Sequence, residues 1–166
     1  HRASGLMGKY LIKLNNFSNP AVLPHLDNRA LRQRVMEASL ARGSRGNAWD
    51  NTALISRVMT LRAQEAEMLG YPNYAAYSLG NQTAKTPEAV NSMLGKLAPA
   101  AVANAHREAA DMQALIDKTQ KAKGQPTFKL EPWDWAYYAE KVRQERYDFD
   151  ESQLKPYLEL DNVQQN

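Results

Sequence analysis

The fold of this chain is decided by residues 69–79, which read Leu-Gly-Tyr-Pro-Asn-Tyr-Ala-Ala-Tyr-Ser-Leu. Gly70 follows an apolar helical pattern, at the place where a left-handed residue commonly ends a helix, and Pro72 prevents the helix from continuing. The tyrosines and leucine after Pro72 predict a short further helix over residues 74–79. The stretch therefore predicts two helices separated by an aromatic turn.

A long helix is predicted directly after this turn. Thr86 is a good N-cap, Pro87 suits the first helical position, and Glu88 lies favourably in the first turn. The apolar pattern continues to about residue 118, and Pro99 inside it is expected to kink the helix. The residues of the pattern are Val90, Met93, Leu94, Leu97, Ala101, Ala105, Ala109, Met112, Leu115 and Ile116.

The same 3.6-residue period indicates further helices elsewhere in the chain. A short apolar run at 10–14 is a candidate strand, whose partner is either 127–130 or a segment outside this sequence. We therefore expect an all-α chain of antiparallel helices, with at most a minor strand pair, that forms a single helical segment over residues 1–166. The further helices cover 28–42, 51–69, a region from Pro132, and a last region from Asp148 or Asp150 to Val163, with loops at 15–26, 43–49 and 119–131.

The composition is that of an ordinary globular protein. Hydrophobic residues make up 43% of the 166 residues and charged residues 23%, with a net charge of +3. The basic residues are spread among acidic neighbours, which argues against a nucleic-acid partner. No apolar run reaches the roughly 20 residues that span a bilayer, so no membrane association is expected. The absence of cysteine is typical of a reducing compartment and favours a cytoplasmic location.

Histidine is too scarce and too scattered for a helical zinc site. Such a site needs two histidines one turn apart with a glutamate beside them. The chain has only His1, His25 and His106, and Ala110 stands one turn after His106, where a second ligand would be needed. The sequence also lacks a nucleophile elbow and a phosphate-binding glycine loop. We assign no catalytic, cofactor-binding or metal-binding residue.

Two other groups of residues have alternative interpretations. Glu65 with Glu67, and Glu108 with Asp111, are either carboxylate pairs for a proton or divalent ion, or solvated helix faces with basic neighbours. The aromatic residues are either a stacking wall for a ligand or packing residues of a core or an interface. Those aromatic residues are Trp133, Trp135, Tyr137 and Tyr138, which surround Asp134, and Tyr71, Tyr74 and Tyr77.

Three stretches together resemble the zinc oligopeptidase family, which includes thimet oligopeptidase, oligopeptidase A and the bacterial peptidyl-dipeptidases. Their order and spacing match, and the resemblance extends from about Gly8 to Val163, nearest to the bacterial branch. The first stretch is Asn28-Arg29-Ala30-Leu31-Arg32 with Ala41-Arg42-Gly43, the second is Leu61-Arg62 through 69–77 to Lys85-Thr86-Pro87-Glu88, and the third is Trp133-Asp134-Trp135-Ala136-Tyr137-Tyr138 with Lys141-Val142-Arg143 and Tyr147-Asp148-Phe149-Asp150-Glu151.

The resemblance implies a function that resides mainly outside this chain. Enzymes of the family are largely helical, with a deep channel in which one zinc is held by a His-Glu-x-x-His helix and a further glutamate. They cleave short peptides, and the bacterial branch removes dipeptides from the carboxyl end. That motif would lie beyond residue 166, so the segment is expected to form scaffold and channel wall, to bind no zinc itself and to be inactive alone.

The expected partners follow from the same resemblance. They are the remainder of the peptidase and, in the parent protein, short peptide substrates, with self-association of exposed apolar faces as a further possibility. The alternative interpretation is a stand-alone helical module that binds a peptide or another protein along the long helix. Weak RNA binding is a third interpretation.

Overall fold

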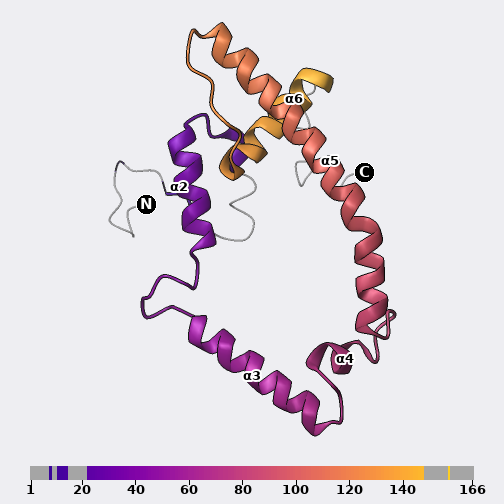
Figure 1. The fold of residues 1–166 in the computed structure, drawn as a ribbon. Helices are drawn as coiled ribbons and strands as arrows, with labels where there is room; N and C mark the ends of the chain where they lie inside the picture. The colour runs from indigo at the N-terminus through magenta and orange to yellow at the C-terminus, as the bar shows by residue number, and fades with distance from the viewer. Residues whose placement is uncertain (1–7, 9–10, 15–21, 148–156, 158–166) are drawn as a thin grey trace. The chain divides into compact units, whose positions relative to one another are not determined.

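A computed structural model of the chain describes residue 8, residues 11–14, residues 22–147 and residue 157. All regular secondary structure in these ranges is helical (Figure 1), which confirms the predicted all-α class. The helix predicted from Asp148 or Asp150 onward lies outside the described residues. The elements are η2 (Leu23–His25), α2 (Arg29–Leu40), α3 (Thr52–Met68), α4 (Tyr74–Leu79), α5 (Pro87–Ala122), η3 (Pro132–Asp134) and α6 (Trp135–Tyr147).

The end of α3 has the geometry that the glycine and proline predict. Gly70 has a φ of 78°, in the left-handed region that favours glycine. Its N–H donates to the carbonyl of Glu67 at 3.0 Å, and the N–H of Tyr71 donates to the carbonyl of Ala66 at 2.9 Å. This pair of bonds satisfies carbonyls that the last helical turn would otherwise leave without a donor.

Short polar side chains fix the helix starts. Asn28, Asn73 and Thr86 each accept a hydrogen bond, through a side-chain oxygen, from the backbone N–H three residues further along, at 3.0, 2.9 and 3.2 Å. Before α3, the Asp50 carboxylate accepts a hydrogen bond from the backbone N–H of Thr52 at 2.9 Å. Such caps satisfy N–H groups that a helix cannot pair internally.

The predicted long helix is present as α5, which runs unbroken for 36 residues with Pro99 inside it. Proline has no N–H, so the carbonyl of Gly95 loses its helical donor without ending the helix. The helix is longer than expected and takes in residues 119–122 of the predicted loop. Gly124, with a φ of 62°, follows its end in the left-handed conformation.

Contacts divide the chain into two units, which we describe separately. Unit 1 contains residues 1–36 and 108–166, and unit 2 contains residues 37–107. The expected single segment over residues 1–166 stays a prediction. Among the described residues, none of the helices is long and apolar enough to cross a membrane.

The core of unit 1 lies where α6 meets the C-terminal part of α5. Met112 and Ile116 from α5 and Tyr138 from α6 are buried together. Side chains that are partly buried surround this cluster, and they come from both helices and from the segment that connects them. They are Leu115, Phe128, Leu130, Trp135, Tyr137 and Val142.

The candidate strand pair is not formed. The described residues 11–14 and 127–130 are in neither strand nor helix, and Tyr10 lies outside the described residues. A side chain of α5 takes the place of a strand partner: Gln113 donates through Nε2 to the carbonyl of Phe128 at 2.9 Å and accepts through Oε1 from the N–H of Leu130 at 2.8 Å. One amide thus satisfies two backbone groups of an extended segment, which removes the need for a second strand.

Replacement of this amide tests its role. We expect Gln113→Leu to lower the free energy of unfolding of unit 1 by roughly 1–3 kcal/mol, because two backbone groups lose their partner. Urea denaturation followed by tryptophan fluorescence in a Trp49→Phe background measures unit 1, which contains Trp133 and Trp135.

The matched control is Gln125→Leu, the same chemical change at an exposed position of unit 1. It should alter the free energy of unfolding by less than about 0.5 kcal/mol. Equal effects of the two substitutions would show that the Gln113 amide has no special role.

Candidate functional site

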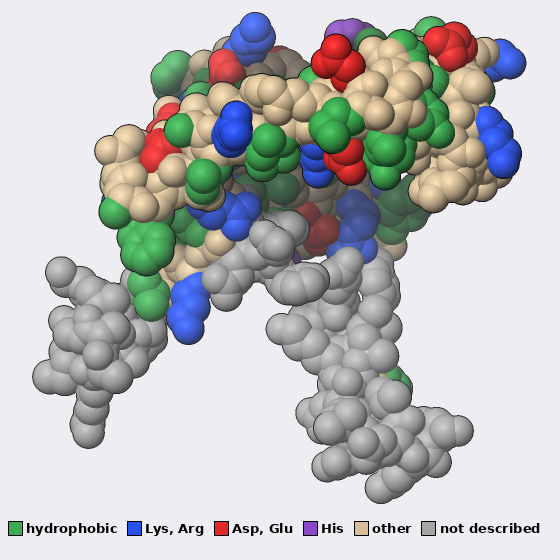
Figure 2. All heavy atoms as spheres, turned by 90° about the horizontal axis from the view of Figure 1, so that it is seen from below, with side chains coloured by type: hydrophobic (Ala, Val, Ile, Leu, Met, Phe, Trp, Pro, Cys, Tyr) green, Lys and Arg blue, Asp and Glu red, His purple; other side chains and the backbone are tan. Residues whose placement is uncertain are grey.

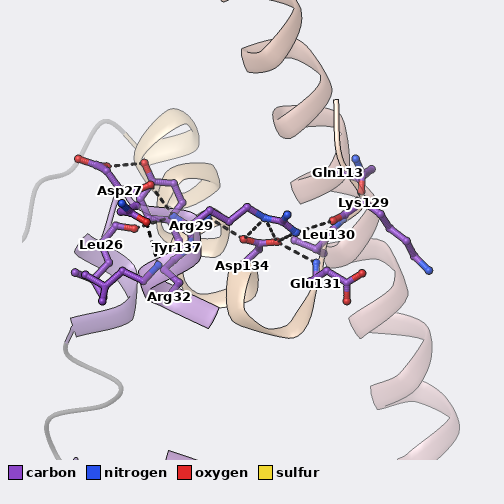
Figure 3. A network of polar contacts seen from close by, with 12 residues as sticks. Leu26, Asp27, Arg29, Arg32, Gln113, Lys129, Leu130, Glu131, Asp134 and Tyr137 are labelled. Carbon is purple, nitrogen blue, oxygen red and sulfur yellow. Dashed lines mark hydrogen bonds and ion pairs between the residues drawn. The ribbon is translucent and has the colours of Figure 1, made fainter. Parts of the chain in front are cut away.

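The most elaborate polar cluster of unit 1 joins the start of α2 to η3 and α6 (Figure 3). We call Asp27, Arg29, Arg32, Asp134 and Tyr137 the Asp134 network. Asp134 is completely buried and Arg32 is 1% exposed, whereas the side chain of Arg29 is 37% exposed. Buried charges of this kind are rare unless they are paired.

The Asp134 carboxylate is held by donors on both of its oxygens. Arg29 donates to Oδ2 through Nη2 at 2.8 Å and lies 3.1 and 3.0 Å from the two oxygens through Nε. Arg32 donates to Oδ1 through Nη2 at 2.8 Å. The backbone N–H of Glu131 also donates to Oδ2, at 3.2 Å. The carboxylate therefore exchanges water for a full set of charge-assisted bonds.

The rest of the network fixes the chain just before α2. Arg32 donates through Nη1 to the carbonyls of Leu26 and Asp27, at 2.7 and 3.1 Å. The Tyr137 hydroxyl donates to the Asp27 carboxylate at 2.7 Å. These bonds hold residues 26–32 against α6, although more than one hundred residues separate the two segments in sequence.

Aromatic rings cover both guanidinium groups. The Arg29 guanidinium lies 4.2 Å from the centre of the Phe128 ring, and that of Arg32 lies 4.3 Å from the centre of the Tyr137 ring. A cation over a ring face is attracted by the ring's negative charge density, and the attraction grows where water is excluded. The rings therefore both stabilise the cations and shield them from solvent.

Two groups of the network, Asp134 and Tyr137, have pKa values that are shifted away from neutrality. Burial raises the pKa of Asp134, but hydrogen bonds and charge from Arg29 and Arg32 outweigh this effect, and the pKa is lowered overall. Burial and the bond to the Asp27 carboxylate raise the pKa of Tyr137 to about 12. Both groups hold one protonation state across physiological pH, which suits a structural role better than proton transfer.

Sequence reasoning missed the arginines of this network, although a local signal was available. Arg29 and Arg32 lie in the first turns of α2, and the first turn contains no acidic residue. Cations are unfavourable at a helix N-terminus, because the positive end of the helix dipole lies there. Two arginines at such a place indicate an anionic partner from elsewhere in the chain, and Asp134 is that partner.

The aromatic residues flagged by sequence are packing residues in the structure. Tyr138 belongs to the buried core, and Trp135 and Tyr137 pack around it. The indole N–H of Trp133 is buried with no hydrogen-bond acceptor among the described residues. In unit 2 the ring of Tyr77 lies 5.4 Å from that of Tyr71 and 5.8 Å from that of Tyr74.

The flagged histidines and carboxylates are not assembled into a metal site. His25 and His106 are exposed, and His1 lies outside the described residues. Glu65 and Glu67 are two residues apart on α3, so they point to nearly opposite sides of the helix. Within the described ranges, no group of three or more acidic or histidine side chains could hold a metal ion. The absence of catalytic, cofactor-binding and metal-binding residues stays a prediction.

The other acidic pair, Glu108 and Asp111, lines a groove between α5 and α6 that has a volume of about 240 Å³. Among its lining residues, Asp111 forms an ion pair with Arg146 at 2.5 Å, and Arg143 forms one with Glu140, which lies outside the lining, at 2.8 Å. The hydrogen bond from Arg143 lowers the pKa of Glu140, and the hydrogen bond to Asp111 raises that of Arg146. The groove therefore stabilises a helix pair and offers no group poised to transfer a proton.

Sequence comparisons with known proteins relate this chain to peptidases. A family model described as "Peptidase family M3" matches residues 22–166. The chain is 44% identical over 162 residues to the dipeptidyl carboxypeptidase of Escherichia coli, which covers 98% of this chain and 23% of that protein. It is 38% identical over 164 residues to the dipeptidyl carboxypeptidase of Salmonella typhimurium, with 99% and 23% covered.

A third relative is the oligopeptidase A of Escherichia coli. It is 35% identical over 154 residues, which covers 90% of this chain and 22% of the relative. The chain thus spans less than a quarter of the length of the curated relatives that it matches.

Asp134→Asn tests the importance of the buried carboxylate. It keeps the shape of the side chain but leaves Arg32 buried without its counter-charge, so we expect the free energy of unfolding of unit 1 to fall by about 3–5 kcal/mol. Asp111→Asn is the matched control, because it removes the same charge from an exposed ion pair and should lower that energy by about 1 kcal/mol at most. Similar losses in both variants would contradict the assigned role of the network.

The lowered pKa of Asp134 predicts a pH dependence with a definite sign. Its contribution to stability is complete above the unfolded pKa of about 3.9 and is lost as pH falls through the lower folded pKa. We expect the difference in free energy of unfolding between the native chain and Asp134→Asn to shrink as pH is lowered from about 5 to about 2. Urea titrations at several pH values measure this difference, and a constant difference would argue against the ion pair.

Proposed function

The chain belongs to peptidase family M3, and we propose that it is one segment of a longer zinc-dependent peptidase of the peptidyl-dipeptidase or oligopeptidase type. The observation that carries the proposal is the alignment with dipeptidyl carboxypeptidase, which takes in 98% of this chain but only 23% of the relative. A segment of that size is large enough for one structural part of such an enzyme.

We propose that the segment contributes scaffold and channel wall. The Asp134 network supports this role, because it fixes α2 against α6 without leaving a reactive group for catalysis. The described residues do not fit a zinc site, so zinc and its ligands belong to the remainder of the parent protein in this proposal. There the metal would activate water for attack on the peptide carbonyl of short peptide substrates.

A second candidate is a stand-alone helical module that binds a peptide or another protein. It is favoured by the exposed apolar residues of α3, which would be available to such a partner. The two proposals differ in what completes the chain: a peptidase remainder or an independent ligand. A cytoplasmic location stays a prediction that rests on the absence of cysteine.

The proposed function is tested by a chimera in which this chain replaces the aligned segment of the Escherichia coli dipeptidyl carboxypeptidase. We expect the chimera to release dipeptides from the carboxyl end of a short peptide, to lose this activity with a chelator and to regain it with zinc. The 166-residue chain alone should release none. Liquid chromatography of the products measures both.

Two outcomes would contradict the proposal. One is a folded chimera that hydrolyses no peptide, which would favour the independent module. The other is hydrolysis by the purified chain alone that is abolished by a chelator, which would show that the segment contains its own metal centre.

A further inference from the structure

Helix α3 of unit 2 exposes several apolar side chains on one side, which also carries Glu65 between Leu61 and Leu69. Every residue from 51 to 73 is exposed except Ala66, which is completely buried. We call Leu54, Val58, Leu61 and Leu69 the α3 face, because their spacing places them on one side of the helix. Their exposed fractions are 63%, 41%, 46% and 52%.

The neighbours of α3 do not cover this face. Among the described elements, α4 is the one that makes extensive contact with α3. Most helices in proteins, including those as long as the 17 residues of α3, gain most of their stability from burial of an apolar face. The caps of α3 define its ends, but they do not replace the stabilisation that the α3 face would gain from burial.

A hollow lies mostly on a different side of α3 from the α3 face, because Met59, Ala63 and Glu67 in its lining are about 100–180° further round the helix than Val58. It has a volume of about 530 Å³ and lies between the last turns of α3 and the turn that leads to α4. Met59, Arg62 and Tyr74 are among its lining residues, and the Arg62 guanidinium lies 4.9 Å from the centre of the Tyr74 ring. Figure 2 shows hydrophobic side chains at the surface of the described residues, interspersed with charged ones.

We propose that the α3 face docks an apolar-faced helix from the part of the longer peptidase chain outside these 166 residues. The inference rests on the proposed function. The α3 face would then be the surface through which this segment contacts the remainder of the longer peptidase. The helical spacing of the α3 face fits ridges-into-grooves packing against a second helix.

The lengths of the relatives favour this occupant over a second copy of the chain. In the dipeptidyl carboxypeptidase of Escherichia coli the aligned segment is 23% of the protein, so most of that protein is tethered to it. A tethered helix is present at an effective concentration of about a millimolar when the connection permits contact. A free second copy would have to reach such a concentration in solution to compete.

Two single-cysteine variants test the inference, because the native chain contains no cysteine. Val58→Cys places a thiol on the α3 face, and Thr60→Cys places one about 200° further round the same helix. Both substitutions nearly preserve side-chain size, and both native residues are exposed. The rate of maleimide labelling at each position is measured in the 166-residue chain and in the chimera described above, with labelled sites identified by peptide mapping.

We expect Val58→Cys to react about tenfold more slowly, or slower still, in the chimera than in the 166-residue chain, because burial restricts access and disfavours the thiolate. Thr60→Cys should change by less than about twofold. Equal reactivity of Val58→Cys in both proteins would overturn the inference. So would labelling of Val58→Cys in the 166-residue chain that slows as chain concentration rises, because the occupant would then be a second copy.

Failure of this inference and failure of the proposed function are distinguishable. A chimera that protects Val58→Cys but hydrolyses no peptide contradicts the function and supports the docking. A chimera that hydrolyses peptides and leaves Val58→Cys fully reactive supports the proposed function and contradicts the docking. If the chimera is insoluble, the same two replacements at the aligned positions of the Escherichia coli relative repeat the comparison, and full reactivity at the position of Val58 would again overturn the docking.

Discussion

The structure of unit 1 depends on the burial of one carboxylate. Asp134 is removed from water, which is unfavourable for a charged group unless other charges and donors replace the solvent. Arg29 and Arg32 supply that replacement from 105 and 102 residues away in sequence. Because both arginines must be in place, the start of α2, η3 and α6 form together or leave a buried charge unpaired. Pairing of this kind specifies one arrangement of the chain even where its net contribution to stability is modest.

Unit 2 is organised by a different kind of interaction. Its helices begin and end at local signals: the side chain of Asp50 before α3, the left-handed Gly70 after it, and the Thr86 cap before α5. Within the described ranges, Ser39 and Ala66 are its buried residues, so little apolar burial supports these helices. Local signals determine where a helix starts and stops, whereas burial supplies most of its stability. Because unit 2 has the local signals but little burial, the exposed apolar residues of α3 are the part of this unit that would gain most from a partner.

This division also explains what the sequence could predict. Helix ends at Gly70 and starts at Asn28 and Thr86 follow from interactions within a few residues, so pattern reasoning found them. The structure has no strand at residues 11–14 or 127–130, in agreement with the predicted all-α class, and the Gln113 side chain satisfies the backbone of residues 128 and 130, an arrangement that no local pattern encodes. The Asp134 network was missed because the pairing partners are distant, although two arginines at the positive end of α2 were a usable signal. For the aromatic run at 133–138 the sequence left two interpretations open, and the burial and ring contacts of Trp135, Tyr137 and Tyr138 favour packing.

The same network bears on what the likeness to peptidases means. The first and third stretches that resemble the oligopeptidase family contain Arg29, Arg32 and Asp134, and these residues meet in a buried ion-pair network. Their chemistry is that of packing: the Asp134 pKa is lowered by its partners, and both of its oxygens are occupied by donors. Their burial and pairing assign these three residues to packing within unit 1. In the proposed scaffold role, the segment acts through what it packs against, so the proposed occupant of the α3 face bears on that role as much as any residue within this chain.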